Sequence, residues 1–209
     1  MIKTDVTKPA EVEPMVKKTL TEFQRIDVLV NNAGGKVQEG PMLEKSSKQF
    51  DIEYALNFYS VVVCTMLVVP QMIEQKRGRI INITTDASLL ALDLRAFYAG
   101  CKAGVTVMSQ SLGKELGRYG ITVNVVSPGV IPPQNEEDLG QQSSWNPASG
   151  YNPRPMLPGW QERASAMNPM RRLGTPQDLA NAVLFFASER SDYINGQIIS
   201  VSGGFTTFK

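Results

Sequence analysis

Apolar positions in this chain follow two spacings, and the two alternate along the sequence. Short apolar runs of the kind that form buried strands are predicted at 26–30, 79–84, 121–126 and 198–201. Longer segments, in which apolar residues recur every three to four positions, predict helices at 9–23, 46–75, 97–118 and 177–188. Strands that alternate with helices of this length indicate an α/β fold with a doubly wound parallel sheet.

Individual residues indicate which face of a helix is buried and where a helix begins or bends. The apolar stripe of the first helix consists of Val12, Met15, Val16, Leu20 and Phe23. Pro70 lies inside the second helix, where it predicts a kink. Thr175 and Pro176 suit the N-cap and the first turn of the last helix. The stretch 131–158 differs in composition from the rest, because it is rich in Pro, Gln, Asn, Ser and Gly.

Length and charge narrow the possible partners. The 209 residues suit one domain with a sizeable core, and the net charge of +1 gives no indication of nucleic acid or an anionic membrane as a partner. The longest apolar run, 61–69, is too short to span a bilayer and is interrupted by Cys64 and Thr65. The chain opens without the apolar stretch of a signal peptide. We therefore expect a cytoplasmic protein that binds neither membrane nor nucleic acid.

The chain contains no histidine. This excludes Ser-His-Asp and Cys-His catalysis and any His-ligated metal, so we expect no metal site. Proton transfer must then use Tyr, Lys, Asp or Glu. The two cysteines, Cys64 and Cys101, indicate a reducing compartment without a disulfide framework, and we expect Cys101 to pack in the core.

Tyr98 and Lys102 form the most informative pair. Residues four apart lie one turn apart on the same face of a helix. A lysine ammonium beside a phenol stabilises the phenolate, so that Tyr98 is expected to exchange protons near neutral pH. The pair alone is weak evidence, because Tyr-x-x-x-Lys occurs by chance in many helices.

Several further segments accompany this pair in a fixed order, and Thr85 lies 13 residues before Tyr98. Together they resemble the classical short-chain dehydrogenases/reductases over essentially the whole chain. The matching segments are 5–7, 27–34, Asn57, 79–85, 98–102, 124–129 and 202–204. The resemblance implies a single Rossmann-like domain over 1–209 and an NAD- or NADP-dependent oxidoreductase that interconverts a secondary alcohol and a ketone, with 3-oxoacyl reduction a common activity of the family.

The resemblance also implies roles for individual residues. Tyr98 would give a proton to the substrate oxygen in reduction and take it back in oxidation, while the cofactor carries the hydride. Lys102 would lower the pKa of Tyr98 and bind the nicotinamide ribose. Thr85 would hold the substrate oxygen, and Asn57 would fix a water that relays protons to Lys102. The remaining cofactor contacts would come from Asp5, Val6, Asn32, Ala33, Gly34, Pro128, Gly129 and Ile131.

The resemblance extends to the lid and to assembly. The region 131–168 falls where the family places its substrate lid, with Trp145, Tyr151, Met156, Leu157 and Trp160 available to close over an apolar ligand. The alternative is a flexible surface loop. The two long helices form subunit interfaces in the family, so a homodimer or homotetramer acting on a small-molecule alcohol or ketone is expected.

The chain departs from the family pattern in three places. Thr85 replaces the usual serine, and Pro133 lies where a threonine often contacts the nicotinamide. The opening strands and the T-G-x-x-x-G-x-G loop are absent from this sequence. We therefore expect an N-terminally truncated Rossmann-like sheet in which 26–30 is an unprotected edge strand. The alternative function is a catalytically silent homologue that binds a related subunit or another partner.

Each motif also has a purely structural interpretation. Asn31 and Asn32 suit a turn that ends a strand, and Thr85 suits a strand by its β-branched side chain. Asn57 also suits a buried polar residue that bonds a neighbouring carbonyl, although the active-site interpretation is preferred. The acidic residues that flank the predicted site, Asp86 and Asp93, are candidates for contacts with the substrate, but solvated loop charges are the preferred interpretation.

Overall fold

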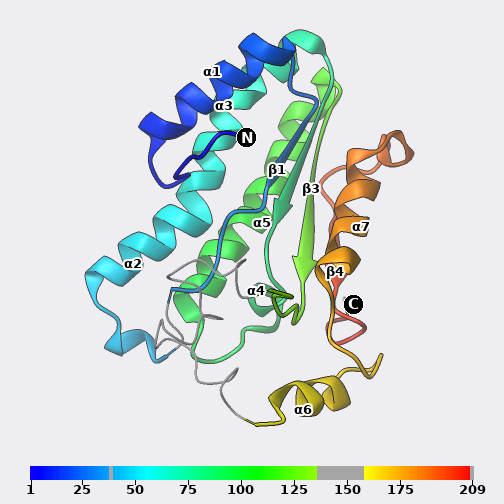
Figure 1. Cartoon of the computed structure of the whole chain (residues 1–209). Coiled ribbons are helices and arrows are strands. Elements are labelled where there is room, and N and C mark those ends of the chain that lie inside the picture. The colour runs from blue at the N-terminus through cyan, green and yellow to red at the C-terminus, as the bar shows by residue number, and fades with distance from the viewer. Residues whose placement is uncertain (38–39, 136–157, 208–209) are drawn as a thin grey trace.

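The computed structural model describes residues 1–37, 40–135 and 158–207 (Figure 1). The strands are β1 (Val28–Asn31), β2 (Gly78–Ile83), β3 (Ile121–Pro128) and β4 (Ile198–Val201). The α-helices are α1 (Pro9–Phe23), α2 (Ser47–Tyr54), α3 (Ser60–Gln75), α4 (Ala87–Leu90), α5 (Ala96–Leu116), α6 (Trp160–Met167) and α7 (Pro176–Ala187). Short 3₁₀ turns are found at Met42–Glu44, Gly117–Tyr119 and Glu189–Ser191.

The four strands form one parallel sheet in the order β1-β2-β3-β4. Asn31 of β1 pairs with Asn82 of β2, and Asn82 pairs in turn with Val125 of β3, so the carboxyl ends of the strands meet at one edge of the sheet. In the described part of the chain β1 is an edge strand, and Val30 is 40% exposed. The predicted parallel α/β sheet is confirmed.

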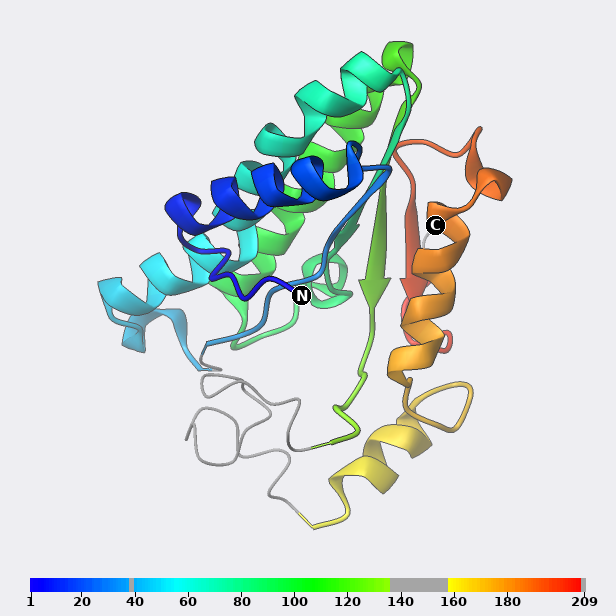
Figure 2. The same cartoon turned by 45° about the horizontal axis from the view of Figure 1, so that its top comes forward.

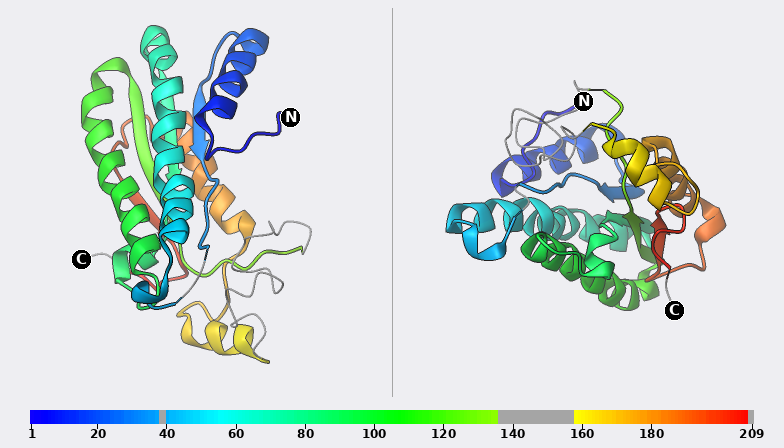
Figure 3. Two further views of the ribbon diagram at one scale, coloured as in Figure 1. Left: turned by 90° about the vertical axis from the view of Figure 1, so that its left-hand side faces the viewer. Right: turned by 90° about the horizontal axis from the view of Figure 1, so that it is seen from below.

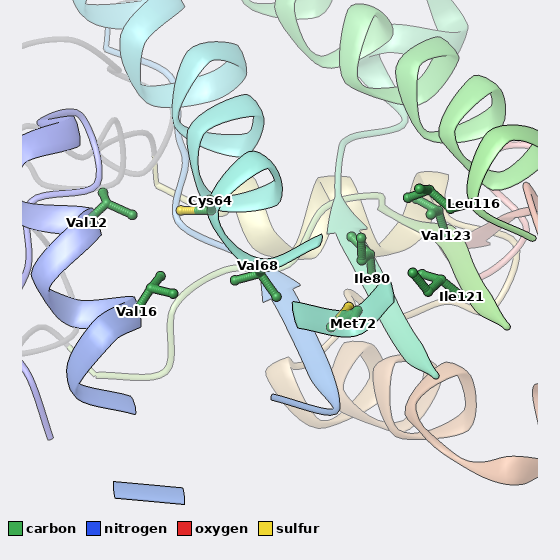
Figure 4. Close-up of a cluster of buried hydrophobic side chains, with 9 residues drawn as sticks. All are labelled: Val12, Val16, Cys64, Val68, Met72, Ile80, Leu116, Ile121 and Val123. Carbon is green, nitrogen blue, oxygen red and sulfur yellow. The ribbon is translucent and has the colours of Figure 1, made fainter. Parts of the chain in front are cut away.

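Helices cover both faces of this sheet, as Figure 3 shows. On one face α3 packs on β1 and β2, α5 packs on β3, and α1 lies against α3. Their shared core is drawn in Figure 4 and consists of Val12, Val16, Cys64, Val68, Met72, Ile80, Leu116, Ile121 and Val123. On the other face α7 packs on β2, β3 and β4. Phe186 of α7 is fully buried there with Ile81, Ile83 and Val126.

The sequence located most elements correctly, with two corrections. The stripe of α1 buries Val12 and Val16, but Phe23, which lies at the end of that helix, is 68% exposed. The predicted helix at 46–75 is interrupted at Ala55–Tyr59 by a π-helical turn, whereas Pro70 lies within α3. A π-helical turn inside a longer helix is rare and is often found at functional sites.

The continuous helical stretch Ser47–Gln75 would be long and apolar enough to cross a membrane by length and composition alone. This differs from the sequence analysis, which considered only the uninterrupted apolar run. In the structure 39% of the apolar window within that stretch is buried, and Val68 and Met72 pack in one core cluster with Val12 and Val16 of α1.

Helix α6 occupies the end of the predicted lid region and lies beyond the carboxyl ends of β3 and β4 (Figure 2). Of the aromatic and apolar residues that the sequence assigned to the lid, Trp160 begins this helix. The others, Trp145, Tyr151, Met156 and Leu157, lie outside the described residues.

Candidate active site

A cavity of about 1480 Å³ opens at the carboxyl ends of the strands. Its wall includes Asn32 and Gly34 after β1, Thr85 after β2, and 128–133 at the end of β3 and beyond it. The first two turns of α5 contribute further residues to the wall, and α6 and α7 close the cavity from the opposite side. Open α/β sheets bind ligands at this edge, because the loops that follow parallel strands converge there.

Tyr98 faces this cavity from the first turn of α5 and is partly buried. Burial raises its pKa to about 12, since removing the phenolate from water outweighs the opposing effects of a hydrogen bond with Thr85 and the charge of Arg95. The expectation that Lys102 brings this pKa towards neutrality is wrong for this structure. At neutral pH Tyr98 is a protonated phenol, which is the form that can donate a proton.

Lys102 lies one helical turn after Tyr98 and is only 2% exposed. Its ammonium donates a hydrogen bond to the Ile83 carbonyl at 2.9 Å, where β2 ends. Burial lowers the pKa of Lys102 to about 8, because the charged form loses its hydration. The side chain is therefore poised to lose or gain a proton close to physiological pH.

Asn57 reaches the same region from the centre of the π-helical turn and is fully buried. Its Oδ1 accepts a hydrogen bond from the Gly35 N–H, and its Nδ2 donates to the Gly35 and Glu53 carbonyls, all at 2.9–3.0 Å. A β-carbon at Gly34 would lie 2.8 Å from Lys102 Nζ and 3.1 Å from Asn57 Oδ1. Asn57 therefore fixes the loop after β1 directly over the lysine.

A buried ion pair supports Asn57 from the preceding turn, and the sequence analysis missed it. Lys45 Nζ lies 2.8 Å from Glu53 Oε2, and the two side chains are 3% and 0% exposed. Glu53 Oε1 also accepts a hydrogen bond from the Val37 N–H at 3.3 Å. The negative charge of Glu53 contributes to the raised pKa of Tyr98, so the pair belongs to the electrostatic surroundings of the site.

Thr85 follows β2 and joins the cavity wall, and its hydroxyl accepts a hydrogen bond from the Ala87 N–H at 3.3 Å. The next residue corrects the sequence analysis: Asp86 is not solvated but 2% exposed, and it accepts hydrogen bonds from Ser127 and Ser200. Asp93, the other acidic residue considered, is exposed. Cys64 and Cys101 are buried and free.

The structure brings together most of the residues assigned to cofactor contacts, but not all of them. Those in the cavity wall are Asn32, Gly34, Tyr98, Lys102, Pro128, Gly129 and Ile131. Asp5, Val6 and Ala33 do not form part of that wall, and Asp5 is exposed, with its carboxylate bonded to the Thr7 hydroxyl and backbone N–H. Among the described residues, no group of three or more acidic or cysteine side chains is arranged to hold a metal ion.

The donor set of the cavity fits a nicotinamide dinucleotide. A glycine at position 34 leaves open the space beside Lys102 that a side chain would fill. The volume exceeds the 300–1,000 Å³ or so that is usual for a single small ligand, so a dinucleotide and a substrate can be accommodated together. A phenol and a hydroxyl that are hydrogen-bonded to each other in the cavity wall are groups that can hold and protonate a carbonyl oxygen.

Comparison with known proteins gives a consistent assignment. Residues 1–206 match a protein-family model described as enoyl-(acyl carrier protein) reductase. The chain is 36% identical over 204 residues to a (2S)-[(R)-hydroxy(phenyl)methyl]succinyl-CoA dehydrogenase subunit from Thauera aromatica, covering 98% of this chain and 75% of that protein. It is 35% identical to a 3-oxoacyl-[acyl-carrier-protein] reductase from Synechocystis, covering 99% of this chain and 76% of that protein.

Solved structures give the same result. A gluconate 5-dehydrogenase from Burkholderia cenocepacia, in complex with NADP and tartrate, superposes with a TM-score of 0.83 at 28% identity, covering 96% of this chain and 72% of that one. ElxO with NADP bound superposes with a TM-score of 0.82 at 27% identity, covering 96% of this chain and 75% of that one.

Proposed function

Because this chain belongs to the classical short-chain dehydrogenase/reductase family and is an NAD(P)-dependent oxidoreductase of alcohols and ketones, we propose that Tyr98 carries its proton transfer. The observation that supports this most directly is that Tyr98, Thr85 and Lys102 line one cavity and that the Tyr98 phenol is hydrogen-bonded to Thr85. With a pKa of about 12, Tyr98 is protonated at neutral pH, which is the form that donates a proton in ketone reduction.

Each of the other proposed residues has a distinct task. Thr85 donates a hydrogen bond that holds the carbonyl oxygen next to Tyr98. Lys102, with a pKa of about 8, supplies a proton towards Tyr98 after each turnover. Asn57 holds the loop after β1 next to Lys102 through its two hydrogen bonds with Gly35. When bound, the dinucleotide supplies the hydride, and we assign its binding to Asn32, Gly34 and the stretch 128–131.

We propose further that the substrate carries a negative charge. Every charged side chain that lines the cavity, within the described part of the chain, is cationic: Lys36, Arg95, Lys102 and Arg163. Arg95 lies close to the reacting end, because its charge lowers the pKa of Tyr98. The relatives named above act on a CoA thioester and an acyl-carrier-protein thioester, whose carriers are anionic. A 3-oxoacyl thioester or a 3-oxo acid is the substrate class that combines these properties.

This proposal is tested by following NADPH and NADH consumption with ketones of equal length that differ only in charge. A 3-oxo acid is expected to give a kcat/KM at least tenfold above that of the neutral ketone of the same length. Arg95→Gln should remove most of that preference, whereas Arg118→Gln, an exposed residue outside the cavity wall, should leave it unchanged. Equal turnover of charged and neutral ketones would overturn the substrate class.

We also propose that the region 131–168 acts as a lid over the substrate and that the chain works in the cytoplasm as a homodimer or homotetramer. Support for assembly comes from the long helices, where Met66 of α3 and Val107 of α5 are 69% and 61% exposed. Light scattering on the purified chain tests this. A monomer at micromolar concentration would contradict it.

A further inference from the structure

Asp86 carries a charge that the proposed chemistry does not use. Its carboxylate is 2% exposed at the end of β2, directly after Thr85. Among the described residues no lysine or arginine pairs with it; its hydrogen-bond donors are two serine hydroxyls. Burying a carboxylate without a counter-ion is energetically unfavourable, because the two hydrogen bonds replace only part of its hydration. Fold stability is therefore a poor reason for an acidic residue at this position.

The two hydroxyls come from the neighbouring strands. Ser127 of β3 donates to Asp86 Oδ1 at 2.7 Å and is itself fully buried. Ser200 of β4 donates to Oδ2, also at 2.7 Å, and makes a second hydrogen bond of 2.8 Å with the Ser202 hydroxyl. The backbone N–H of Asp86 donates to the Pro128 carbonyl at 2.9 Å. One side chain therefore joins the carboxyl ends of β2, β3 and β4.

These contacts connect two walls of the cavity. Thr85, whose hydroxyl is hydrogen-bonded to Tyr98, precedes Asp86 in the chain. Ser127 leads directly into the stretch 128–133 of the cavity wall, which includes the residues 128–131 that we assign to cofactor binding. Because Asp86 is held at both carboxylate oxygens and at its backbone N–H, the backbone directly after Thr85 is held against that wall.

We propose that Asp86 is a positioning residue for the reaction, and that it acts through Thr85. Its hydrogen bonds to Ser127 and Ser200 hold the loop after β2 against the end of β3, so that the Thr85 hydroxyl meets the substrate oxygen when the carbonyl carbon faces the cofactor. The proposal rests on the proposed function, in which Thr85 and Tyr98 hold the same oxygen. Misplacing a reacting group by about 1 Å typically costs on the order of 10²-fold in rate.

The test measures kcat and KM for ketone and cofactor in Asp86→Ala, Asp86→Asn and the control Asp93→Ala, which changes an exposed acid in the same loop. Asp86→Ala is expected to lower kcat at least tenfold, with the KM for NADPH within twofold of wild type. Asp86→Asn keeps both hydrogen bonds possible and should recover kcat to within threefold. Asp93→Ala should behave as wild type.

A double-mutant cycle separates positioning from a general structural effect. If Asp86 acts through Thr85, Asp86→Ala should lower kcat less than twofold in a Thr85→Val background. An equal loss in both backgrounds, or a folded Asp86→Ala variant with wild-type kcat, would overturn the proposal. If Asp86→Ala does not fold, the test uses Ser200→Ala, which removes one of the two hydroxyls from a partly exposed position. This variant should lower kcat at least threefold, and an unchanged kcat would overturn the proposal. Full activity of Tyr98→Phe would instead refute the proposed function.

Discussion

Replacing Lys45 with Met is expected to destabilise the fold strongly, because it leaves a carboxylate without its counter-ion in the protein interior. Lys45 Nζ and Glu53 Oε2 lie 2.8 Å apart, with side chains 3% and 0% exposed. Glu53 cannot turn to solvent without also breaking its hydrogen bond with the Val37 N–H. Its helix also carries Asn57, so the loss should reach the active site.

The magnitude follows from the geometry of the pair. Two unit charges at this separation attract each other by about 6 kcal/mol at an effective dielectric constant of about 20. The variant recovers part of this loss through relaxation and water entry, so we expect the free energy of unfolding to fall by about 3–5 kcal/mol. With a urea dependence of about 2 kcal/mol/M, the unfolding midpoint should move down by about 2 M.

Two variants complete this urea experiment. Lys48→Met changes an exposed lysine of α2, the helix that carries Glu53, and should leave the urea midpoint of unfolding unchanged. The double variant Lys45→Met/Glu53→Leu removes both charges and should regain all but about 1–2 kcal/mol, since apolar replacement of a buried pair is often neutral. A loss below about 1 kcal/mol in Lys45→Met, or a double variant as unstable as the single one, would refute this reasoning.

Three further predictions concern the cavity and the helix ends. Gly34→Ala should lower kcat at least tenfold, because the new methyl group displaces the Lys102 ammonium, while the free energy of unfolding changes by less than about 1 kcal/mol. The control is Gly35→Ala, where a β-carbon meets nothing within 4 Å. Equal activity of the two variants would contradict this prediction. The pKa of Lys102 is about 8 when folded, below its ordinary 10.5, so the unfolded chain binds this proton more tightly and stability is gained as pH rises. In urea unfolding, wild type should therefore gain about 2 kcal/mol relative to Lys102→Met between about pH 8 and about pH 10, and a constant difference would refute the shift. Thr175→Ala removes the capping box of α7 and should cost about 1 kcal/mol in thermal unfolding; an unchanged melting temperature would rule the cap out.

The sequence was sufficient for the parts of the fold that depend on local pattern. The β2 and β3 runs were located within two residues, because every residue of β2 is buried and its isoleucines mark the strand in the sequence. The cap of α7 was read correctly from Thr175 and Pro176, since capping depends on neighbours within one turn. Tyr98, Lys102 and Thr85 were brought to one cavity as their order along the chain had indicated.

What the sequence missed depends on distant partners. Asp86 was taken for a solvated loop charge because the serines that hold it lie 41 and 114 positions further along the chain. Glu53 lies eight positions after Lys45, which would separate the two residues by about 12 Å along a continuous helix. They meet because the helix of Glu53 begins only after the Ser46 N-cap, and Lys45 ends the preceding 3₁₀ turn. The pKa of Tyr98 was predicted in the wrong direction, since burial, which no local motif encodes, outweighs the neighbouring charges.

The central claim, that Tyr98 is the proton donor, is tested most directly by deuteride transfer from 4-deuterated NADPH or NADH to a 3-oxoacyl-CoA, measured for wild type and for Tyr98→Phe. Calorimetry measures cofactor binding by both proteins. The account predicts that wild type forms the deuterated 3-hydroxyacyl product. Tyr98→Phe should bind the cofactor with the same affinity but form product at least about 100-fold more slowly. Undiminished transfer by a folded Tyr98→Phe variant would contradict the assignment of Tyr98 as the proton donor.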